Sequence, residues 1–325
     1  MLTCQFCGLS DAEGSELFEL DRHGTGFWCS DCDGFTYLNE TDVKHRFTLI
    51  LEDKHAGKST VAPPNIKLAK RLSPYRYPGG KSKIIEYLAS HLQATKSKTL
   101  VSPFTGGGGF ELAMLDAGLV QNLHLNDLDT GVYSLWWVIK HMPYTIIERL
   151  RSASPTHKDY FKAQGIIKRD YVGVDALDAA WASLIVNRLA YSGIPYANPL
   201  GGKKGTKKAL LSRWNPISLE NRIHHIHSLS QHITITQLNA VELIEEAYWQ
   251  DDASIFIDPP YVEQGKRLYH CNYSEQDHRE LSQVLDTLHM SFPGADIIVT
   301  YDYNKWLDDL YDYPQKEVIS RTYSI

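Results

Sequence analysis

One four-residue motif has residue types suited to chemistry on an aromatic amine. Asp258-Pro259-Pro260-Tyr261 follows the apolar run 254–257, which is typical of a buried strand. The two prolines fix the backbone and remove two amide donors, while the Pro259 carbonyl and the Asp258 carboxylate remain as acceptors. Tyr261 adds a flat face on which a heterocyclic base could stack, a contact worth about 1–3 kcal/mol. The motif predicts a site for a ring-bound NH2 group, although Pro-Pro taken alone is also a common end to a strand.

An amino group on an aromatic ring is a weak nucleophile because its lone pair is delocalised into the ring. Hydrogen bonds from its two protons to Asp258 and to the Pro259 carbonyl would make the nitrogen pyramidal and direct the lone pair at an electrophile. Asp258 need not remove a proton beforehand, since the amine becomes acidic once it carries the new group. The expected catalysis is by positioning and not by a strong base.

Four of the five cysteines form a second constellation near the start of the chain. They occur as two Cys-x2-Cys pairs, Cys4 with Cys7 and Cys29 with Cys32, which can supply a tetrahedral shell for a structural zinc ion. A closed shell of four thiolates leaves no position for a substrate, so the module is expected to stabilise, dock or bind. Disulfides are the weaker alternative because no export signal is apparent. The fifth, Cys271, is interpreted as a buried or idle thiol.

A glycine-rich turn, residues 103–109, follows the predicted strand 99–102. Four successive glycines let a ligand approach bare backbone where a strand turns into a helix. The Gly-x4-Gly-Lys-Ser/Thr pattern that holds nucleotide phosphates does not occur in this turn. Asp127 closes the next predicted strand about twenty residues later, the separation at which a carboxylate commonly receives a ribose hydroxyl. The expected ligand is a nucleoside without phosphates, although Asp127 could also act only as a helix cap.

The elements that must position these motifs alternate between short β-type runs and amphipathic segments. This alternation predicts an α/β fold with a mostly parallel sheet. The expected strands are 99–102, 122–126, 232–237, 254–257 and 295–300, and the expected helices include 83–93, 110–117, 131–141, 175–189 and 277–289. Paired prolines at 63–64 favour an extended linker. The predicted domains are a zinc ribbon at 1–45, a linker at 46–70 and the main domain at 71–325.

Composition and charge set limits on the location and the partners. With 325 residues and 43% hydrophobic content the chain can bury a sizeable core, and no run is apolar for the roughly 18 residues of a membrane span. We expect a cytoplasmic protein with no membrane partner. The net charge of −6 conceals two acid-free basic runs, at 54–83 and at Lys203, Lys204, Lys207, Lys208 and Arg213. Either run taken alone is most simply a solvated face.

Taken together and in this order, the motifs resemble the Dam-like, alpha-group (D12 class) DNA adenine N6-methyltransferases, over residues 72–325. The catalytic motif 258–261 matches in full, residues 73–81 look like the family's leading motif, and 125–127 look like its ribose-binding step. The resemblance implies a Rossmann-like fold that binds S-adenosylmethionine. The cofactor residues that it implies are Tyr77, Gly79, Lys81, Pro103, Phe104, Gly106, Gly107, Gly108, Asp127, Asn239 and Asp258.

The family also carries a DNA-recognition insert, and residues 187–213 are similar to it, within an insert of about 143–228. The DNA-binding residues that this likeness implies are Arg188, Tyr191, Asn198, Lys203, Lys204, Lys207, Lys208 and Arg213. Cationic side chains there can neutralise phosphates, while aromatic ones can reach bases. Double-stranded DNA is therefore the expected partner, with the target adenine flipped out of the stack.

Three departures from the family pattern bear on function. Ser102 stands where an acidic residue is common, and Asn239 replaces the usual Asp, although its amide oxygen can still accept from the cofactor's adenine. The sequence stops at 321–325, where relatives usually continue through a final strand. Either the sheet is completed differently or a partner chain supplies the edge, and the zinc ribbon could also dock a protein.

The expected activity is methyl transfer from S-adenosylmethionine to adenine N6 in DNA, and a restriction-modification or defence system would suit it. Two alternatives stay open on the residues. One is a weakly active or inactive DNA-binding component of a larger assembly. The other is methylation of RNA adenine or of the N4 amino group of cytosine, because both present a ring NH2.

Overall fold

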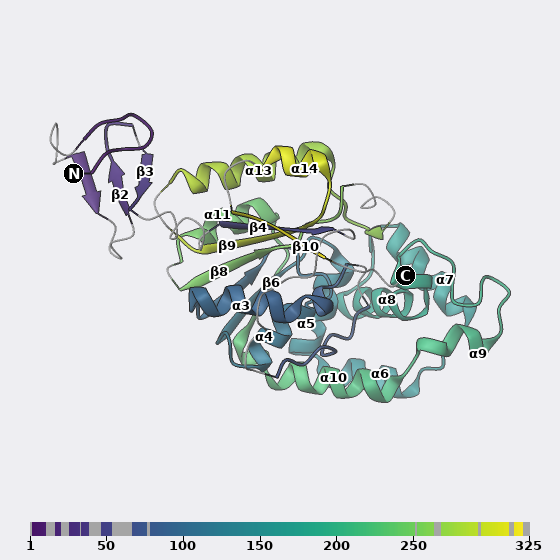
Figure 1. Ribbon diagram of the computed structural model, residues 1–325. Helices are drawn as coiled ribbons and strands as arrows, with labels where there is room; N and C mark the ends of the chain where they lie inside the picture. The colour runs from purple at the N-terminus through teal and green to yellow at the C-terminus, as the bar shows by residue number, and fades with distance from the viewer. Residues whose placement is uncertain are drawn as a thin grey trace.

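A seven-stranded sheet lies at the centre of the computed structural model, in the order β10-β4-β9-β8-β5-β6-β7 (Figure 1). In chain order its strands are β4 (Phe47–Asp53), β5 (Thr99–Ser102), β6 (Asn122–Asn126), β7 (Ile233–Thr236), β8 (Ala253–Ile257), β9 (Asp296–Asp302) and β10 (Gln315–Ser320). All neighbouring strands pair in parallel. The predicted α/β class with a mostly parallel sheet is confirmed. The structure describes residues 2–10, 17–20, 26–32, 34–38, 47–53, 67–76, 79–250, 252–262, 268–291, 294–311 and 315–320.

Helices cover both faces of this sheet (Figure 1). One face carries α3 (Ile85–Thr95), α4 (Gly109–Asp116) and α5 (Thr130–His141), and the other carries α11 (Ala240–Tyr248), α13 (Glu275–His289) and α14 (Lys305–Leu310). Strands covered on both sides are expected to read as continuous apolar runs, and all five residues of β8 are buried. Each face therefore has its own apolar cluster.

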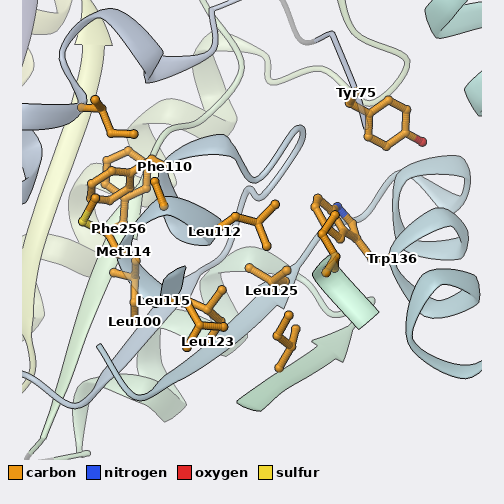
Figure 2. Packing of buried hydrophobic residues seen from close by; sticks show 14 of the residues in the cluster. Tyr75, Leu100, Phe110, Leu112, Met114, Leu115, Leu123, Leu125, Trp136 and Phe256 are labelled. Atoms are coloured by element: carbon orange, nitrogen blue, oxygen red, sulfur yellow. The ribbon is translucent and has the colours of Figure 1, made fainter. Parts of the chain in front are cut away.

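The helix α4, which follows the glycine-rich turn, is fixed on the sheet by its apolar side chains (Figure 2). Phe110 packs on Phe256 of β8 with ring centroids 4.6 Å apart. Leu112 and Met114 are fully buried in the same cluster as Leu125 of β6. The turn between β5 and α4 is thus anchored to the centre of the sheet.

The position of β4 corrects the expected linker at 46–70. Phe47–Asp53 is an inner strand, between β9 and β10, with Phe47 opposite Ile297 and Glu52 opposite Ile319. The run Phe-Thr-Leu-Ile-Leu is the pattern of a strand covered on both faces. The linker was predicted from the prolines at 63–64, which lie outside the described residues and do not bear on the strand at 47–53. A segment that precedes the predicted main domain thus forms an inner strand of the sheet.

The expected insert of about 143–228 is helical. It contains α6 (Pro143–Ser152), α7 (His157–Lys168), α8 (Ala176–Leu189), the short α9 (Lys207–Leu210) and α10 (Pro216–Ser228). Side-chain caps begin several of these helices, including a capping box at Thr156 and an Asp175 cap on α8. The helices α7 and α8 share an apolar cluster of their own, and they extend beyond the sheet in Figure 1.

The N-terminal module is a small antiparallel sheet of β1 (Phe18–Leu20), β2 (Gly26–Cys29) and β3 (Gly34–Tyr37). Cys4, Phe27 and Cys29 form its buried centre. The Tyr37 ring stacks on that of His289 at the end of α13, with centroids 6.5 Å apart. In the part of the chain that the structure describes, no helix has the length and apolar character needed to cross a membrane.

Candidate active site

The strand order reverses at the pair β5 and β8, which are hydrogen-bonded neighbours. From β5 the chain continues to β6 and β7 on one side, whereas β8 leads to β9 on the other. Ligands of open parallel sheets bind in the crevice at the carboxyl ends of the strands at such a reversal. A cavity of about 260 Å³ lies there, with the glycine-rich turn after β5 and the catalytic motif after β8 in its wall.

Most of the predicted cofactor residues line this cavity. They are Lys81, Pro103, Phe104, Gly106, Gly107, Gly108, Asp127, Asn239 and Asp258. Tyr77 lies outside the described residues. Gly79 is absent from the wall of this cavity, and it packs against the ring of Tyr261. The structure thus brings together side chains from five separate parts of the chain.

The glycine-rich turn is held by hydrogen bonds with residues of β6, of the loop that follows it and of α5. The Gly106 amide donates to Asp127 Oδ2 at 2.7 Å, and Trp136 Nε1 donates to the Gly106 carbonyl at 3.2 Å. Asn126 Nδ2 donates to the carbonyls of Pro103 and Leu238, at 3.0 and 3.1 Å. Asn126 thereby ties together the two loops that flank the cavity, a role that the sequence analysis did not identify.

Asp127 combines this bracing contact with a position in the cavity wall. Burial, together with the nearby Asp129 carboxylate, raises the pKa of Asp127 to about 7. Its Oδ1 accepts from the Asp129 amide at 2.9 Å. Asn239 is the N-cap of α11, and its Oδ1 accepts from the Val241 amide at 2.8 Å. The predicted ribose and adenine contacts of these two residues stay predictions.

The catalytic motif presents Asp258 with one oxygen engaged by the protein. Lys81 Nζ lies 2.8 Å from Oδ1, and Thr300 Oγ1 donates to the same atom at 2.9 Å. Among the described residues, no donor makes a hydrogen bond to Asp258 Oδ2 or to the Pro259 carbonyl. Burial raises the pKa of Asp258, and the Lys81 ammonium opposes that rise. Asp258 lines the cavity, whereas Pro259 is buried and is absent from the cavity wall. The predicted contacts of an amine with these two acceptors stay predictions.

Tyr261 is buried, with 7% of its surface exposed. Lys81 Nζ lies 5.8 Å from the ring centroid, and the Tyr269 ring meets it edge to face at 6.0 Å. The ring face that was predicted to stack on a base is therefore covered by protein in this structure. Stacking on Tyr261 stays a prediction, and it requires these side chains to give way.

Glu111 is a cavity residue that the sequence analysis missed. It lies in the first turn of α4, is 3% exposed, and accepts from Ser102 Oγ at 2.6 Å. Burial raises its pKa to about 7. A lone acid within the apolar run 110–115 was the available signal. Glu111 supplies a carboxylate beside Ser102, where the family commonly has an acid.

Acidic side chains outnumber basic ones in the wall of the cavity. Its carboxylates come from Glu111, Asp127, Asp129, Asp258, Asp277 and Glu280, and Lys81 is the cation among the residues that line it. Such a wall attracts a cation and repels phosphates. This charge distribution agrees with the expected ligand, a nucleoside without phosphates.

The predicted DNA-binding residues divide into exposed and buried ones. Tyr191, Asn198, Lys203, Lys204, Lys207 and Lys208 are exposed on the insert. Arg188, in contrast, is 8% exposed and its Nη2 donates to the Arg213 carbonyl at 2.9 Å, so its DNA contact stays a prediction. Burial and the nearby Arg222, Arg76 and Arg213 lower the pKa of Arg188 to about 10. Arg188 thus braces the insert from inside, and Arg213 is half-buried beside it.

The four N-terminal cysteines converge on one point. Their Sγ atoms all lie within 4.8 Å of one another, with Cys4 to Cys32 at 3.5 Å and Cys7 to Cys29 at 3.7 Å. A tetrahedral zinc ion with about 2.3 Å bonds to sulfur needs sulfur atoms roughly 3.8 Å apart. The donor set and its spacing therefore fit a metal ion.

Comparisons with known proteins agree with this arrangement. Residues 77–325 match the family model described as D12 class N6 adenine-specific DNA methyltransferase. The chain is 22% identical over 224 residues to the Type II methyltransferase M.MjaIII of Methanocaldococcus jannaschii, covering 64% of this chain and 75% of that protein. It is 21% identical over 213 residues to the Type II methyltransferase M.CviBI of Paramecium bursaria Chlorella virus NC1A, covering 65% and 77%. The chain therefore belongs to the D12 class of N6 adenine-specific DNA methyltransferases.

Proposed function

We propose that the chain transfers a methyl group from S-adenosylmethionine to the N6 amino group of adenine in DNA. The observation that carries the proposal is Asp258 in the wall of the cavity at the reversal of the sheet, with Oδ1 held by Lys81 and Thr300 and with no described donor on Oδ2. The Pro259 carbonyl, the next residue of the motif, is the proposed second acceptor. Two acceptors match the two protons of an NH2 group. Family membership supports the same activity.

The charge of the cavity supports the choice of methyl donor. When bound, S-adenosylmethionine supplies an electrophilic methyl group on a positively charged sulfur. Carboxylates such as that of Glu111 stabilise a cation there, and bare backbone at Gly106–Gly108 lets the ligand approach closely. Asp127 and Asn239, in the same wall, are the proposed partners of its ribose and adenine.

The protein's part in the reaction is to orient the amine and to receive its proton. Asp258 Oδ2 and the Pro259 carbonyl accept one N–H each, which directs the nitrogen lone pair at the methyl carbon. As the new carbon–nitrogen bond forms, the carbon–sulfur bond breaks and its electron pair stays on sulfur. The nitrogen then carries a positive charge, and Asp258 accepts its proton at Oδ2. Lys81 and Thr300 hold the other carboxylate oxygen throughout.

DNA binding is proposed for the exposed face of the insert. Lys203, Lys204, Lys207 and Lys208 form a cluster of cations there without an intervening acid. The insert also reaches the segment after the catalytic motif, where Tyr196 Oη is hydrogen-bonded to His270 Nδ1. Because adenine N6 is inside a duplex, the target nucleotide must leave the stack at a cost of a few kcal/mol.

The decisive experiment supplies the purified chain with duplex DNA and S-adenosylmethionine labelled in the methyl group. We expect label in N6-methyladenine after digestion, and a loss of at least about 100-fold in Asp258→Asn. Asp309→Asn is the matched control, since Asp309 is an exposed residue of α14 paired with Lys305. Cofactor binding without transfer would instead support an inactive component of an assembly. Label in cytosine or only in RNA would refute the assigned substrate.

Base flipping has a separate test. We expect the fluorescence of 2-aminopurine at the target position to rise when the protein binds, because the base loses its stacking neighbours. The same probe one base pair away is the control. An unchanged signal at the target position, with binding confirmed by mobility shift, would contradict flipping.

A further inference from the structure

Glu52 reaches the catalytic motif from outside the region that matches the family. It lies on β4, before residue 77, where the family match begins. Its Oε1 is 2.6 Å from Lys81 Nζ, and Lys81 Nζ is 2.8 Å from Asp258 Oδ1. Glu52 and Lys81 are 2% and 4% exposed. The inner strand β4 therefore contributes a buried carboxylate that is linked to the predicted catalytic acid through Lys81.

Lys81 is held between two carboxylates. A buried ammonium is tolerated only when it is paired and hydrogen-bonded. If Asp258 were its only anion, Lys81 would be drawn fully onto that carboxylate and would make Asp258 a poorer proton acceptor. Glu52 shares the ammonium instead. The Glu52 charge raises the pKa of Asp258, whereas the Lys81 charge lowers it.

The two oxygens of Asp258 have different surroundings. Lys81 and Thr300 both contact Oδ1, and the Lys81 ammonium is also anchored by Glu52. Without this anchor, the flexible lysine side chain could swing to Oδ2, the oxygen that the amine needs.

We propose that Glu52 is a positioning residue for methyl transfer: it holds Lys81 on Oδ1 of Asp258, which keeps Oδ2 available and basic enough to receive the amine proton. The proposal rests on the function proposed above. It makes β4, a segment outside the family match, part of the catalytic apparatus and not only of the sheet.

Several ionisable groups face Asp258 and must be considered in any test by pH. They are Lys81 at the end of the leading motif, Glu52 on β4, Glu111 on α4, Tyr301 on β9 and Tyr269 after the catalytic motif. Burial raises the pKa of both tyrosines well above the usual value, so they stay neutral near pH 7. Glu111 has a pKa of about 7 and titrates in the range of interest.

The test is the pH profile of kcat for the full-length Glu52→Gln variant, measured also in a Glu111→Gln background. Loss of the Glu52 charge should lower kcat at neutral pH by roughly 10- to 100-fold, with a smaller change in KM. The acidic limb should move to lower pH, because Lys81 then stabilises ionised Asp258 more strongly. Glu52→Asp keeps the charge and should keep the limb near its original position.

Glu317→Gln is the matched control. Glu317 lies on β10, the strand beside β4, and its carboxylate is 3.4 Å from His91. It should leave both kcat and the acidic limb unchanged. Thermal unfolding of each variant shows whether it is folded. If Glu52→Gln does not fold, the kcat of Glu52→Asp carries the test, because its carboxylate is one methylene shorter and should hold Lys81 less well, which lowers kcat without moving the limb. An unchanged kcat in Glu52→Asp would then overturn the proposal. Unchanged kcat and an unmoved limb in a folded Glu52→Gln protein would overturn the proposal.

A second readout separates this proposal from the proposed function. Carbon-13 labelled aspartate reports the titration of Asp258 by NMR, with the signal assigned from Asp258→Asn. If the natural chain transfers no methyl group, the proposed function fails, and the Asp258 titration still compares Glu52→Gln with Glu317→Gln. A lower midpoint in Glu52→Gln alone supports the coupling, and equal midpoints refute it.

Discussion

Replacing Gly79 by alanine should separate the Tyr261 ring from the cavity beside it. Gly79 has φ +86°, and a Cβ added there would lie 2.0 Å from Tyr261 Oη and 2.7 Å from its Cζ. Real Cβ atoms essentially never approach another heavy atom within 3.0 Å, so the hydroxyl must retreat by at least the difference between 3.0 and 2.0 Å. A displacement of about 1 Å in a positioning group can cost about 100-fold in rate.

The expected result is therefore a fall of roughly 100-fold in kcat, with a much smaller change in the affinity for S-adenosylmethionine. Gly79 is absent from the wall of the cofactor cavity, which is why binding should be less affected than turnover. The positive φ adds about 1–2 kcal/mol of destabilisation on its own. A control variant with the same backbone destabilisation is therefore needed when the rate of Gly79→Ala is compared with that of the natural chain.

Gly118→Ala supplies this control. Gly118 has φ +68°, and a Cβ added there meets nothing within 4 Å. It carries the backbone penalty without the collision with Tyr261. Single-turnover rates, cofactor Kd and thermal unfolding would be measured for both variants and for the natural chain. Equal rates in folded Gly79→Ala and Gly118→Ala would refute the placement of Tyr261 in the reaction.

Three further predictions concern the cavity, the insert and the cysteine cluster. Because burial raises the pKa of Glu111 to about 7, a cationic methyl donor should bind more tightly as the pH rises through 7. We expect the affinity for the donor, measured by calorimetry, to rise by up to about tenfold between pH 6 and pH 8. Glu111→Gln should remove that part of the dependence, and an unaltered dependence would contradict the role of Glu111. Changing Lys203, Lys204, Lys207 and Lys208 to alanine should flatten the slope of log K against log salt by about 0.9 for each phosphate that the protein no longer neutralises. Lys305→Ala, on exposed α14, should not change this slope, and an equally unchanged slope in the four-lysine variant would show that these lysines do not bind phosphates. Cys7→Ser should abolish retention of one zinc ion per chain in mass spectrometry under native conditions, whereas Cys271→Ser should keep it; equal retention would exclude the cluster.

Local patterns in the sequence were sufficient for the elements around the site. The strands 99–102 and 122–126 were predicted with the bounds that β5 and β6 have, because each is a short β-type segment closed by a turn. The glycine-rich turn and the catalytic motif follow adjacent strands, as their chemistry requires. For Asn126 the sequence indicated only membership of the motif 125–127. Its hydrogen bonds to two distant loops cannot be predicted from its neighbours along the chain.

The tertiary structure decided which residues far apart in the sequence are in contact, and how deeply their side chains are buried. The sequence by itself determined the α/β class, the strand-end motifs and the spacing of the cysteines, because these depend on neighbours along the chain. Arg188 was assigned to DNA by its place in a basic insert, and only packing shows that it is buried. β4 lies between β9 and β10 although more than 200 residues of the chain separate it from both, because parallel strands can pair across long crossover connections. That pairing alone carries Glu52 to Lys81, and burial there gives the contact its electrostatic strength.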